Sequence, residues 1–254
     1  MLLDGRESSV SGTYDRIGAD YRLTRKEDPR LGRLITRELL GARTVLNVGA
    51  GTGSYEPTDR FVVAVEPSRL MLRQRPLGSG PAVQAIAERL PFQDDTFDAA
   101  MAVLTVHHWD DQRAGLSELR RVARERIVVL TCDPSSEGFW LTQDYFPDFL
   151  EADRQRLPPV ERLLSVLEDA QVIPVPIPHD CVDGFLGAYW RRPRAYLNAD
   201  TRRGISSFAA CRDLSPLQRL EEHLDTGEWH RRYGELLEAE ELDIGYRLVV
   251  GRPR

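Results

Sequence analysis

The chain has 254 residues, of which 41% are hydrophobic and 29% are charged, and its formal net charge is −6. This composition is typical of a globular protein with one full hydrophobic core, and its acidic balance argues against a DNA or RNA partner. The longest apolar run, residues 99–106 with Thr105 inside it, is too short to span a bilayer, so we expect no membrane partner.

Short apolar segments rich in β-branched residues predict strands in the first half of the chain. These segments are residues 44–48, 61–65, 82–86, 97–104 and 126–131. Nearly continuous apolar runs of this length suit strands that are buried on both faces of a parallel sheet. Amphipathic patterns over residues 31–39, 116–123 and 160–167 predict helices between and after them. This alternation predicts a doubly wound α/β fold.

Two later segments, residues 172–177 and 246–251, predict the remaining strands. Pro174 and Pro176 lack N–H groups, so the first of these strands belongs at an edge of the sheet. Residues 181–240 contain helical stretches and many turns. We expect one domain over residues 1–254, with residues 181–240 inserted as a helical cap before the last strand.

The strongest chemical signal is the segment from Val45 to Ser54, in which an apolar strand runs into glycines at positions 49, 51 and 53. Glycines there permit a sharp turn and a close approach of the backbone to a ligand. Glu66 ends the next strand, where an acid can accept hydrogen bonds from both ribose hydroxyls. A dinucleotide fingerprint fits poorly, because its last small residue would fall on Ser54 or Glu56.

The connection from the glycine segment to the next strand is unusually short. It runs over residues 54–59 and contains Pro57. Crossovers between parallel strands normally need a dozen or more residues when they include a helix. We therefore predict no helix beyond a single turn in this connection.

Two further segments follow predicted strands at the same edge of the sheet. Residues 87–98 follow the third strand, where a backbone N–H can meet an adenine ring, and residues 104–109 end the fourth. His107 and His108 lie in the second segment, and either is a candidate general base. The alternative is that the pair packs the strand end and orients a loop.

These segments resemble the motif series of class I S-adenosylmethionine-dependent methyltransferases of the type-11, small-molecule kind. The resemblance is strong over residues 12–135. It implies a Rossmann-like seven-stranded sheet, mainly parallel, with an antiparallel last strand, and S-adenosyl-L-methionine as cofactor. The implied cofactor-binding residues are Tyr14, Tyr21, Asn47, Gly49, Ala50, Gly51, Gly53, Glu66, Pro67, Ala87, Glu88 and Leu104. Asn47 departs from the family, which usually has an acid there.

A second group of polar and aromatic residues follows the predicted edge strand. His179, Phe185, Tyr189, Trp190 and Arg191 are candidates for binding the methyl acceptor, with aromatic walls and an arginine for an anionic group. The aromatic residues would alternatively attach the cap to the sheet. Residues 179–181, His-Asp-Cys, have no metal-ligand spacing, and a helix-capping Asp180 explains them more simply, so we expect no metal.

The sequence favours a methyltransferase that transfers a methyl group to a small-molecule acceptor by in-line displacement. Two alternatives stay open: a lyase or cyclase that uses the same cofactor on the same fold, and a non-catalytic cofactor-binding protein. Nucleic acid is disfavoured as a substrate, because the fourth strand ends in His107-His108-Trp109 rather than in an Asp/Asn-Pro-Pro-aromatic motif. Three cysteines and the lack of a secretion signal predict a cytoplasmic protein, without predicting an oligomeric state.

Overall fold

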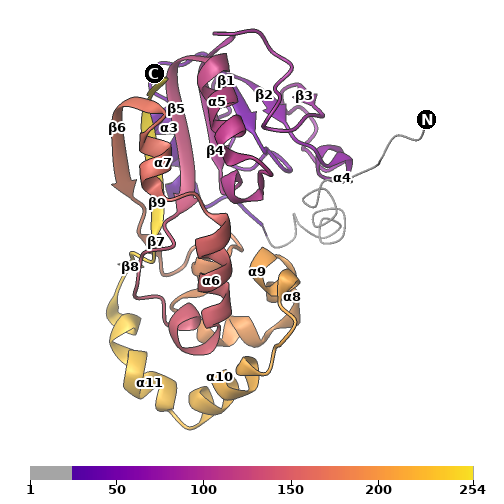
Figure 1. The fold of residues 1–254 in the computed structure, drawn as a ribbon. Helices are drawn as coiled ribbons and strands as arrows, with labels where there is room; N and C mark the ends of the chain where they lie inside the picture. The colour runs from indigo at the N-terminus through magenta and orange to yellow at the C-terminus, as the bar shows by residue number, and fades with distance from the viewer. Residues whose placement is uncertain (1–24, 254) are drawn as a thin grey trace, which may run out of the picture.

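The computed structural model describes residues 25–253. A seven-stranded sheet forms one end of the molecule (Figure 1). Its strands are β1 (Thr44–Val48), β2 (Phe61–Val65), β3 (Ala82–Val83), β4 (Phe97–Val103), β5 (Ala123–Cys132), β6 (Leu167–Pro174) and β9 (Tyr246–Pro253). Their order across the sheet is β3-β2-β1-β4-β5-β9-β6. Strands β1 to β5 pair in parallel, and β9 is antiparallel to both β5 and β6. The predicted doubly wound fold with an antiparallel last strand is confirmed.

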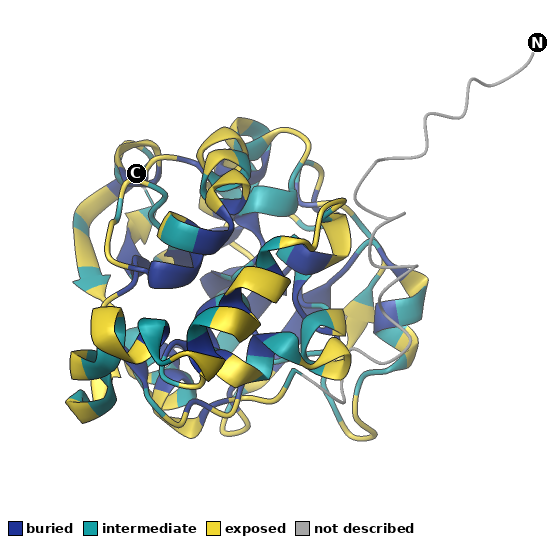
Figure 2. Ribbon diagram, turned by 90° about the horizontal axis from the view of Figure 1, so that it is seen from below, coloured by how far each residue is buried: buried dark blue, intermediate teal, exposed yellow. Residues whose placement is uncertain are grey.

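The sheet separates two hydrophobic cores, because successive side chains of a strand point to opposite faces. In β1, Val45 belongs to one core and Leu46 to the other, and both are fully buried. Helix α3 (Pro29–Glu38) covers the first face with Leu31 and Ile35, and α5 (Gln112–Val122) covers the second. Figure 2 shows the same arrangement, with buried strands inside and helices that expose their outer sides.

Several predicted boundaries are wrong. Strand β3 pairs over two residues only, rather than over residues 82–86. Strand β5 begins at Ala123, and β6 begins at Leu167, although both residues had been assigned to helices. The helix before β6 is therefore short: α7 (Val160–Leu164) ends before Leu167. The polar residues of β6 hid the strand, because an edge strand does not need a continuous apolar run.

The connection between β1 and β2 contains turns and bends but no helix, as predicted. Tyr55 lies within it, in a left-handed conformation with φ of 63°, and is 2% exposed. Its ring packs in the core of the α3 face together with Leu31. One buried aromatic residue thus covers sheet surface that a crossover helix would otherwise cover.

A helical layer lies beyond the carboxyl ends of β1, β4 and β5 (Figure 1). Its α-helices are α6 (Pro147–Arg156), α8 (Ala199–Arg203), α9 (Ser206–Ala210), α10 (Pro216–Asp225) and α11 (Glu228–Tyr233). The shorter helices are the π-helical turn η3 (Leu141–Tyr145) and the 3-10 turns η4 (Leu186–Tyr189), η5 (Pro193–Leu197) and η6 (Gly234–Glu238). Besides residues 181–240, the layer thus includes residues 141–156, which we had not placed there.

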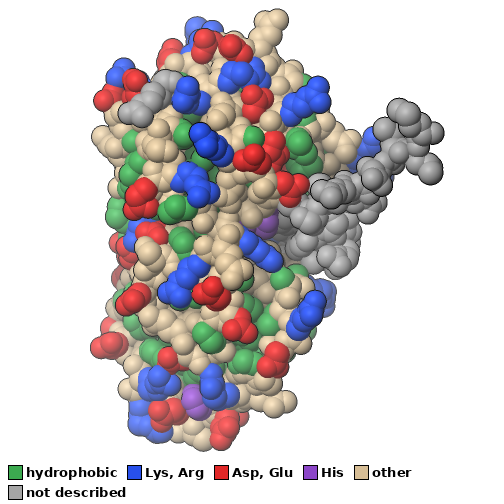
Figure 3. Space-filling view, viewed as in Figure 1, with side chains coloured by type: hydrophobic (Ala, Val, Ile, Leu, Met, Phe, Trp, Pro, Cys, Tyr) green, Lys and Arg blue, Asp and Glu red, His purple; other side chains and the backbone are tan. Residues whose placement is uncertain are grey.

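A small second sheet joins this layer to the main sheet. It pairs β7 (Ile177–Pro178) with β8 (Glu241–Leu242), at the two ends of the segment that we predicted as a cap. Pro174 lies in β6, the edge strand, as its missing N–H requires. Within residues 25–253, no helix is long and apolar enough to cross a membrane. The face drawn in Figure 3 mixes acidic and basic side chains over both layers.

Candidate functional site

The loop after β1 is shaped by its glycines. Gly49 has a φ of +70°, and a Cβ built there would lie 2.0 Å from Thr105 Oγ1. The N–H groups of Gly49 and Ala50 both donate to the Val65 carbonyl, so the loop turns sharply across the end of β2. Strands β1 and β4 are neighbours here, and the connections from them leave to opposite sides of the sheet. Ligands of doubly wound sheets bind at such a switch point.

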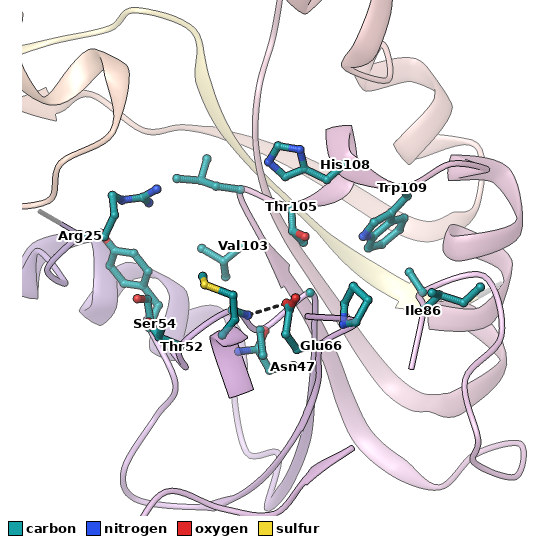
Figure 4. Close-up of a pocket in the computed structure, with 18 of the residues that line it drawn as sticks. Arg25, Asn47, Thr52, Ser54, Glu66, Ile86, Val103, Thr105, His108 and Trp109 are labelled. Atoms are coloured by element: carbon teal, nitrogen blue, oxygen red, sulfur yellow. Dashed lines mark hydrogen bonds between the residues drawn. The ribbon is translucent and has the colours of Figure 1, made fainter. Parts of the chain in front are cut away.

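Glu66 follows β2 and is 6% exposed. One carboxylate oxygen accepts a hydrogen bond from Gly51 N over 2.8 Å (Figure 4), and the other accepts one from Ser68 N over 2.9 Å. The acid therefore holds the glycine loop against the start of α4 (Arg69–Arg73). A carboxylate can accept about four hydrogen bonds, so this role is compatible with binding ribose hydroxyls as well.

These residues line a cleft that we call the glycine-loop cleft. Figure 4 shows Arg25, Ser54 and Thr52 toward one end of it and Ile86 toward the other, with Glu66 between them. Of the residues that the resemblance implied, it is lined by Asn47, Gly49, Ala50, Gly51, Glu66, Pro67, Ala87, Glu88 and Leu104. Gly53 does not line it, and Tyr14 and Tyr21 lie outside the described residues.

Other lining residues were missed by the sequence reasoning. They are Arg25, Thr52, Ser54, Tyr55, Met71, Ile86, Val103, Thr105, Trp109 and Asp110. Most directly follow or precede a residue that had been named, so the cleft extends the same loops. Arg25 and Met71 carried no local signal, because they belong to other segments that only the fold brings here.

Asn47 stands where the family usually has an acid, and the structure shows a carboxylate beside it. Asn47 Nδ2 donates to Glu56 Oε1 over 3.0 Å, and Arg75 binds both Glu56 oxygens over 2.8 Å. Both partners of this ion pair are almost fully buried. The guanidinium balances the carboxylate, so the wall of the cleft behind Asn47 carries no net charge.

His107 and His108 lie in η2 (Val106–His108), the turn that follows β4. Their ring centroids are 3.8 Å apart. Burial, together with the positive charge of Arg156, lowers the pKa of His107 to about 4, and burial lowers that of His108 well below its usual range. Both rings are therefore neutral near neutral pH. His107 Nδ1 is buried and makes no hydrogen bond within the described residues.

A second, larger cavity lies between the sheet and the helical layer, with a volume of about 1490 Å³. We call it the large cavity. Its aromatic lining residues are Trp109, Phe139, Tyr145, Phe146, Phe149, Phe185 and Tyr246. Five residues line both spaces: Arg25, Leu104, His108, Trp109 and Asp110. The two spaces therefore meet at the carboxyl end of β4.

The five residues suggested as acceptor-binding are not brought together in the structure. Phe185 lines the large cavity, but the other four do not. Trp190 is fully buried and its indole N–H donates to the Ile177 carbonyl. Arg191 donates to the Ala239 carbonyl, and Tyr189 packs edge-on against Tyr196. The Trp190 contact joins the helical layer to the small second sheet, and the other two contacts lie within the layer.

The His-Asp-Cys segment makes separate contacts. His179 lies 3.3 Å from a Glu240 carboxylate oxygen, Asp180 pairs with Arg30 over 2.6 Å, and Cys181 is buried. Asp180 therefore binds an arginine and caps no helix, contrary to our interpretation. Across residues 25–253 there is no group of three or more His, Cys, Asp or Glu side chains that could hold a metal ion.

Comparison with known proteins adds to this geometry. Residues 46–130 match the family described as Methyltransferase domain. The chain is 30% identical over 181 residues to a demethylmenaquinone methyltransferase of Mycolicibacterium paratuberculosis, covering 67% of this chain and 77% of that protein. It is 28% identical over 183 residues to the protein of that name from Streptomyces avermitilis, covering 67% and 78%.

Two solved structures share the architecture. A putative methyltransferase from an antibiotic biosynthesis pathway of Anabaena variabilis is 36% identical, with a TM-score of 0.82 over 89% of this chain and 98% of that chain. The 4+2 cyclase SpnF is 16% identical, with a TM-score of 0.54 over 99% of this chain and 98% of that chain. At that identity, the second likeness concerns the fold alone.

Proposed function

The chain belongs to the class I S-adenosylmethionine-dependent methyltransferases of the type-11 kind, and we propose that it binds the cofactor in the glycine-loop cleft and its acceptor in the large cavity. The enzyme transfers a methyl group to a small molecule. The observation that carries the proposal is the meeting of the two spaces at Leu104, His108 and Trp109. A methyl group can pass from one ligand to the other only where their sites adjoin.

The cleft fits S-adenosylmethionine in shape and chemistry. The left-handed glycine loop leaves no side chain between the backbone and a ligand, and Glu66 lies at the middle of the cleft for the ribose (Figure 4). Ile86 and Ala87 supply apolar contact for the adenine ring. Thr52 and Ser54 supply hydroxyls for the amino-acid end, and Arg25, whose charge is paired with Asp183, supplies N–H donors. These assignments give the ligand one orientation, with its reactive centre near Leu104.

When bound, the cofactor supplies an electrophilic methyl group on a sulfonium. The protein then has to align the acceptor with that methyl group and keep water away. His108 and Trp109 lie at the junction of the two spaces, where they can do both. Neutral imidazoles suit this place, because a protonated histidine would repel the sulfonium. His107 or His108 is also the candidate that takes a proton from an acceptor that loses one.

Asn47, which stands where the family usually has an acid, is compatible with cofactor binding in this cleft. The buried Glu56–Arg75 pair behind Asn47 supplies no net charge for the cofactor ammonium. We propose that the Asn47 side-chain oxygen, whose amide nitrogen is committed to Glu56, faces the cleft and accepts a hydrogen bond there. A neutral acceptor replaces the charged one, and the carboxylate of Glu56 holds it in orientation.

Product analysis tests the activity. We expect incubation with methyl-labelled S-adenosylmethionine and a small-molecule extract to transfer label to the extract and to release S-adenosylhomocysteine. Release of methylthioadenosine instead would indicate elimination or cyclisation. Tight cofactor binding without release of either product would indicate a non-catalytic binding protein.

A further inference from the structure

Asp153 is a carboxyl group of the large cavity that has no role in the methyl transfer proposed for this enzyme. It lies on α6 and lines the cavity, and its side chain makes no hydrogen bond or ion pair with any residue from 25 to 253. Other buried or half-buried carboxylates behave differently: Asp28, Glu56, Glu66, Asp98 and Asp183 each accept hydrogen bonds from several donors. Asp153 therefore stands apart as a half-buried acid without a partner.

Two neighbours of Asp153, on β5 and β9, are neutral near neutral pH. Cys132 at the end of β5 and Tyr246 at the start of β9 both interact with its charge, and burial raises the pKa of the Cys132 thiol to about 12 and that of the Tyr246 hydroxyl above its usual range. Helix α6 also contacts η2, which carries the neutral His107. The cation that acts on Asp153 is Arg156 on the same helix. Arg247 on β9, which acts on Cys132, pairs with Asp243 over 2.7 Å rather than with Asp153.

An unpartnered carboxyl group in such a place is unfavourable for the folded chain, because its charged form has lost water without gaining hydrogen bonds. Burial raises its pKa to about 6, so the group is still ionised near neutral pH. Perturbed groups of this kind gather at binding and catalytic sites, where a ligand provides the missing partner. The aromatic walls around it indicate what the rest of that ligand is like.

We propose, as an extension of the proposed function, that Asp153 binds a hydroxyl group of a bulky and mostly apolar methyl acceptor. The cavity, at about 1490 Å³, exceeds the roughly 300–1,000 Å³ of ordinary small-molecule sites, and several phenylalanine and tyrosine rings line it together with charged side chains. A carboxylate only accepts hydrogen bonds, so its partner must donate one. A neutral hydroxyl suits the site better than an ammonium group, because Arg156 already places a positive charge nearby.

Naphthol and its methyl ether form a matched pair of probes, since both fill an aromatic cavity and only the first donates a hydrogen bond. We expect the wild-type chain near neutral pH to bind naphthol at least about tenfold more tightly than the ether, as a hydrogen bond to a charged group implies. In Asp153→Leu this preference should fall below about twofold. Asp148→Leu, also on α6 and lining the same cavity, is the control and should keep the wild-type preference.

The melting temperature is the control that shows whether the variant folds. Asp153→Leu should maintain or raise it, because the change removes an unpartnered charge. The proposal is overturned by a wild-type preference below about twofold, by a preference that survives in Asp153→Leu, by its loss in Asp148→Leu, or by failure of either probe to bind. The titrations need no cofactor. A chain that shows the preference but does not bind S-adenosylhomocysteine would refute the proposed function alone.

Discussion

The Tyr55 hydroxyl donates a hydrogen bond to Asp183 Oδ2 over 2.7 Å, which joins the β1–β2 connection to the chain that enters the helical layer. Asp183 also accepts from Arg25 Nε over 2.7 Å and from Gly184 N. The tyrosine and the aspartate are almost fully buried, and both Tyr55 and Arg25 line the glycine-loop cleft. One buried polar network thus fixes the cleft wall relative to the layer that encloses the large cavity.

Tyr55→Phe removes a buried hydrogen-bond donor and should lower the free energy of unfolding by about 1–2 kcal/mol. Asp183→Asn should cost more, about 3–5 kcal/mol, because it leaves the largely buried Arg25 guanidinium without its carboxylate. Urea unfolding measures both. Tyr189→Phe is the control, since this half-buried hydroxyl has no such partner within residues 25–253. An equal loss in the control would mean that the network is not the cause.

Gly49→Ala should be more destabilising than Gly78→Ala, although both glycines have a left-handed conformation. Gly49 and Gly78 have φ values of +70° and +87°, but a Cβ at Gly49 meets Thr105, whereas nothing lies within 4 Å of one at Gly78. We expect Gly78→Ala to cost about 1 kcal/mol from backbone strain alone. Gly49→Ala should exceed it by at least about 1–2 kcal/mol and weaken cofactor binding. Equal unfolding free energies would show that the contact with Thr105 is not limiting.

The depressed pKa of His107 predicts a loss of stability in acid. The unfolded chain takes up a proton as the pH falls through 6.5, whereas the folded chain does so only near 4. The unfolded state therefore binds more protons in this window, and stability falls as the pH falls, by up to about 3 kcal/mol for this group. His107→Gln should remove that part of the slope. An unchanged slope of unfolding free energy against pH would contradict the burial of a neutral ring.

For Asp153 we predict that stability changes with pH in the opposite direction. Its folded pKa of about 6 exceeds the unfolded value of 3.8, so the folded state binds more protons between these values. This group favours the folded state in acid, and its contribution is lost as the pH rises through about 6. Asp153→Asn should therefore raise the melting temperature near neutral pH and change it little near pH 4. A melting temperature that falls near neutral pH would show that the native carboxylate has a partner.

The sequence was most informative where physical constraints are local. The bounds of β1 and β2 were predicted correctly, because strands buried on both faces have to be apolar throughout. The missing crossover helix followed from the length of the connection. The glycine loop and Glu66 were predicted from the sequence, because few other structures require glycines and an acid at these positions. Both line the cleft.

Long-range contacts were not predictable in the same way. Tyr55 and Asp183 are 128 residues apart, and neither lies in a motif. Asp153 carries no local pattern that separates it from an acid on a solvent-exposed helix. Trp190 and Tyr189 were chosen as acceptor-binding because aromatic clusters suit pockets, but the same residues suit a core, and only the packing distinguishes the two. Truncating Trp190 is therefore expected to damage the fold first.

Cofactor binding in the glycine-loop cleft is tested most directly by a calorimetric titration of S-adenosylhomocysteine into the wild-type chain and into Glu66→Ala. Binding should be weaker by about 2–4 kcal/mol in the variant, or roughly 30- to 1000-fold, because two hydrogen bonds to the ribose are lost. Asp59→Ala, which removes an exposed acid paired with Arg60 outside the cleft, should bind like the wild type. An affinity of Glu66→Ala within about threefold of the wild type, in a chain that melts normally, would show that the cofactor binds elsewhere.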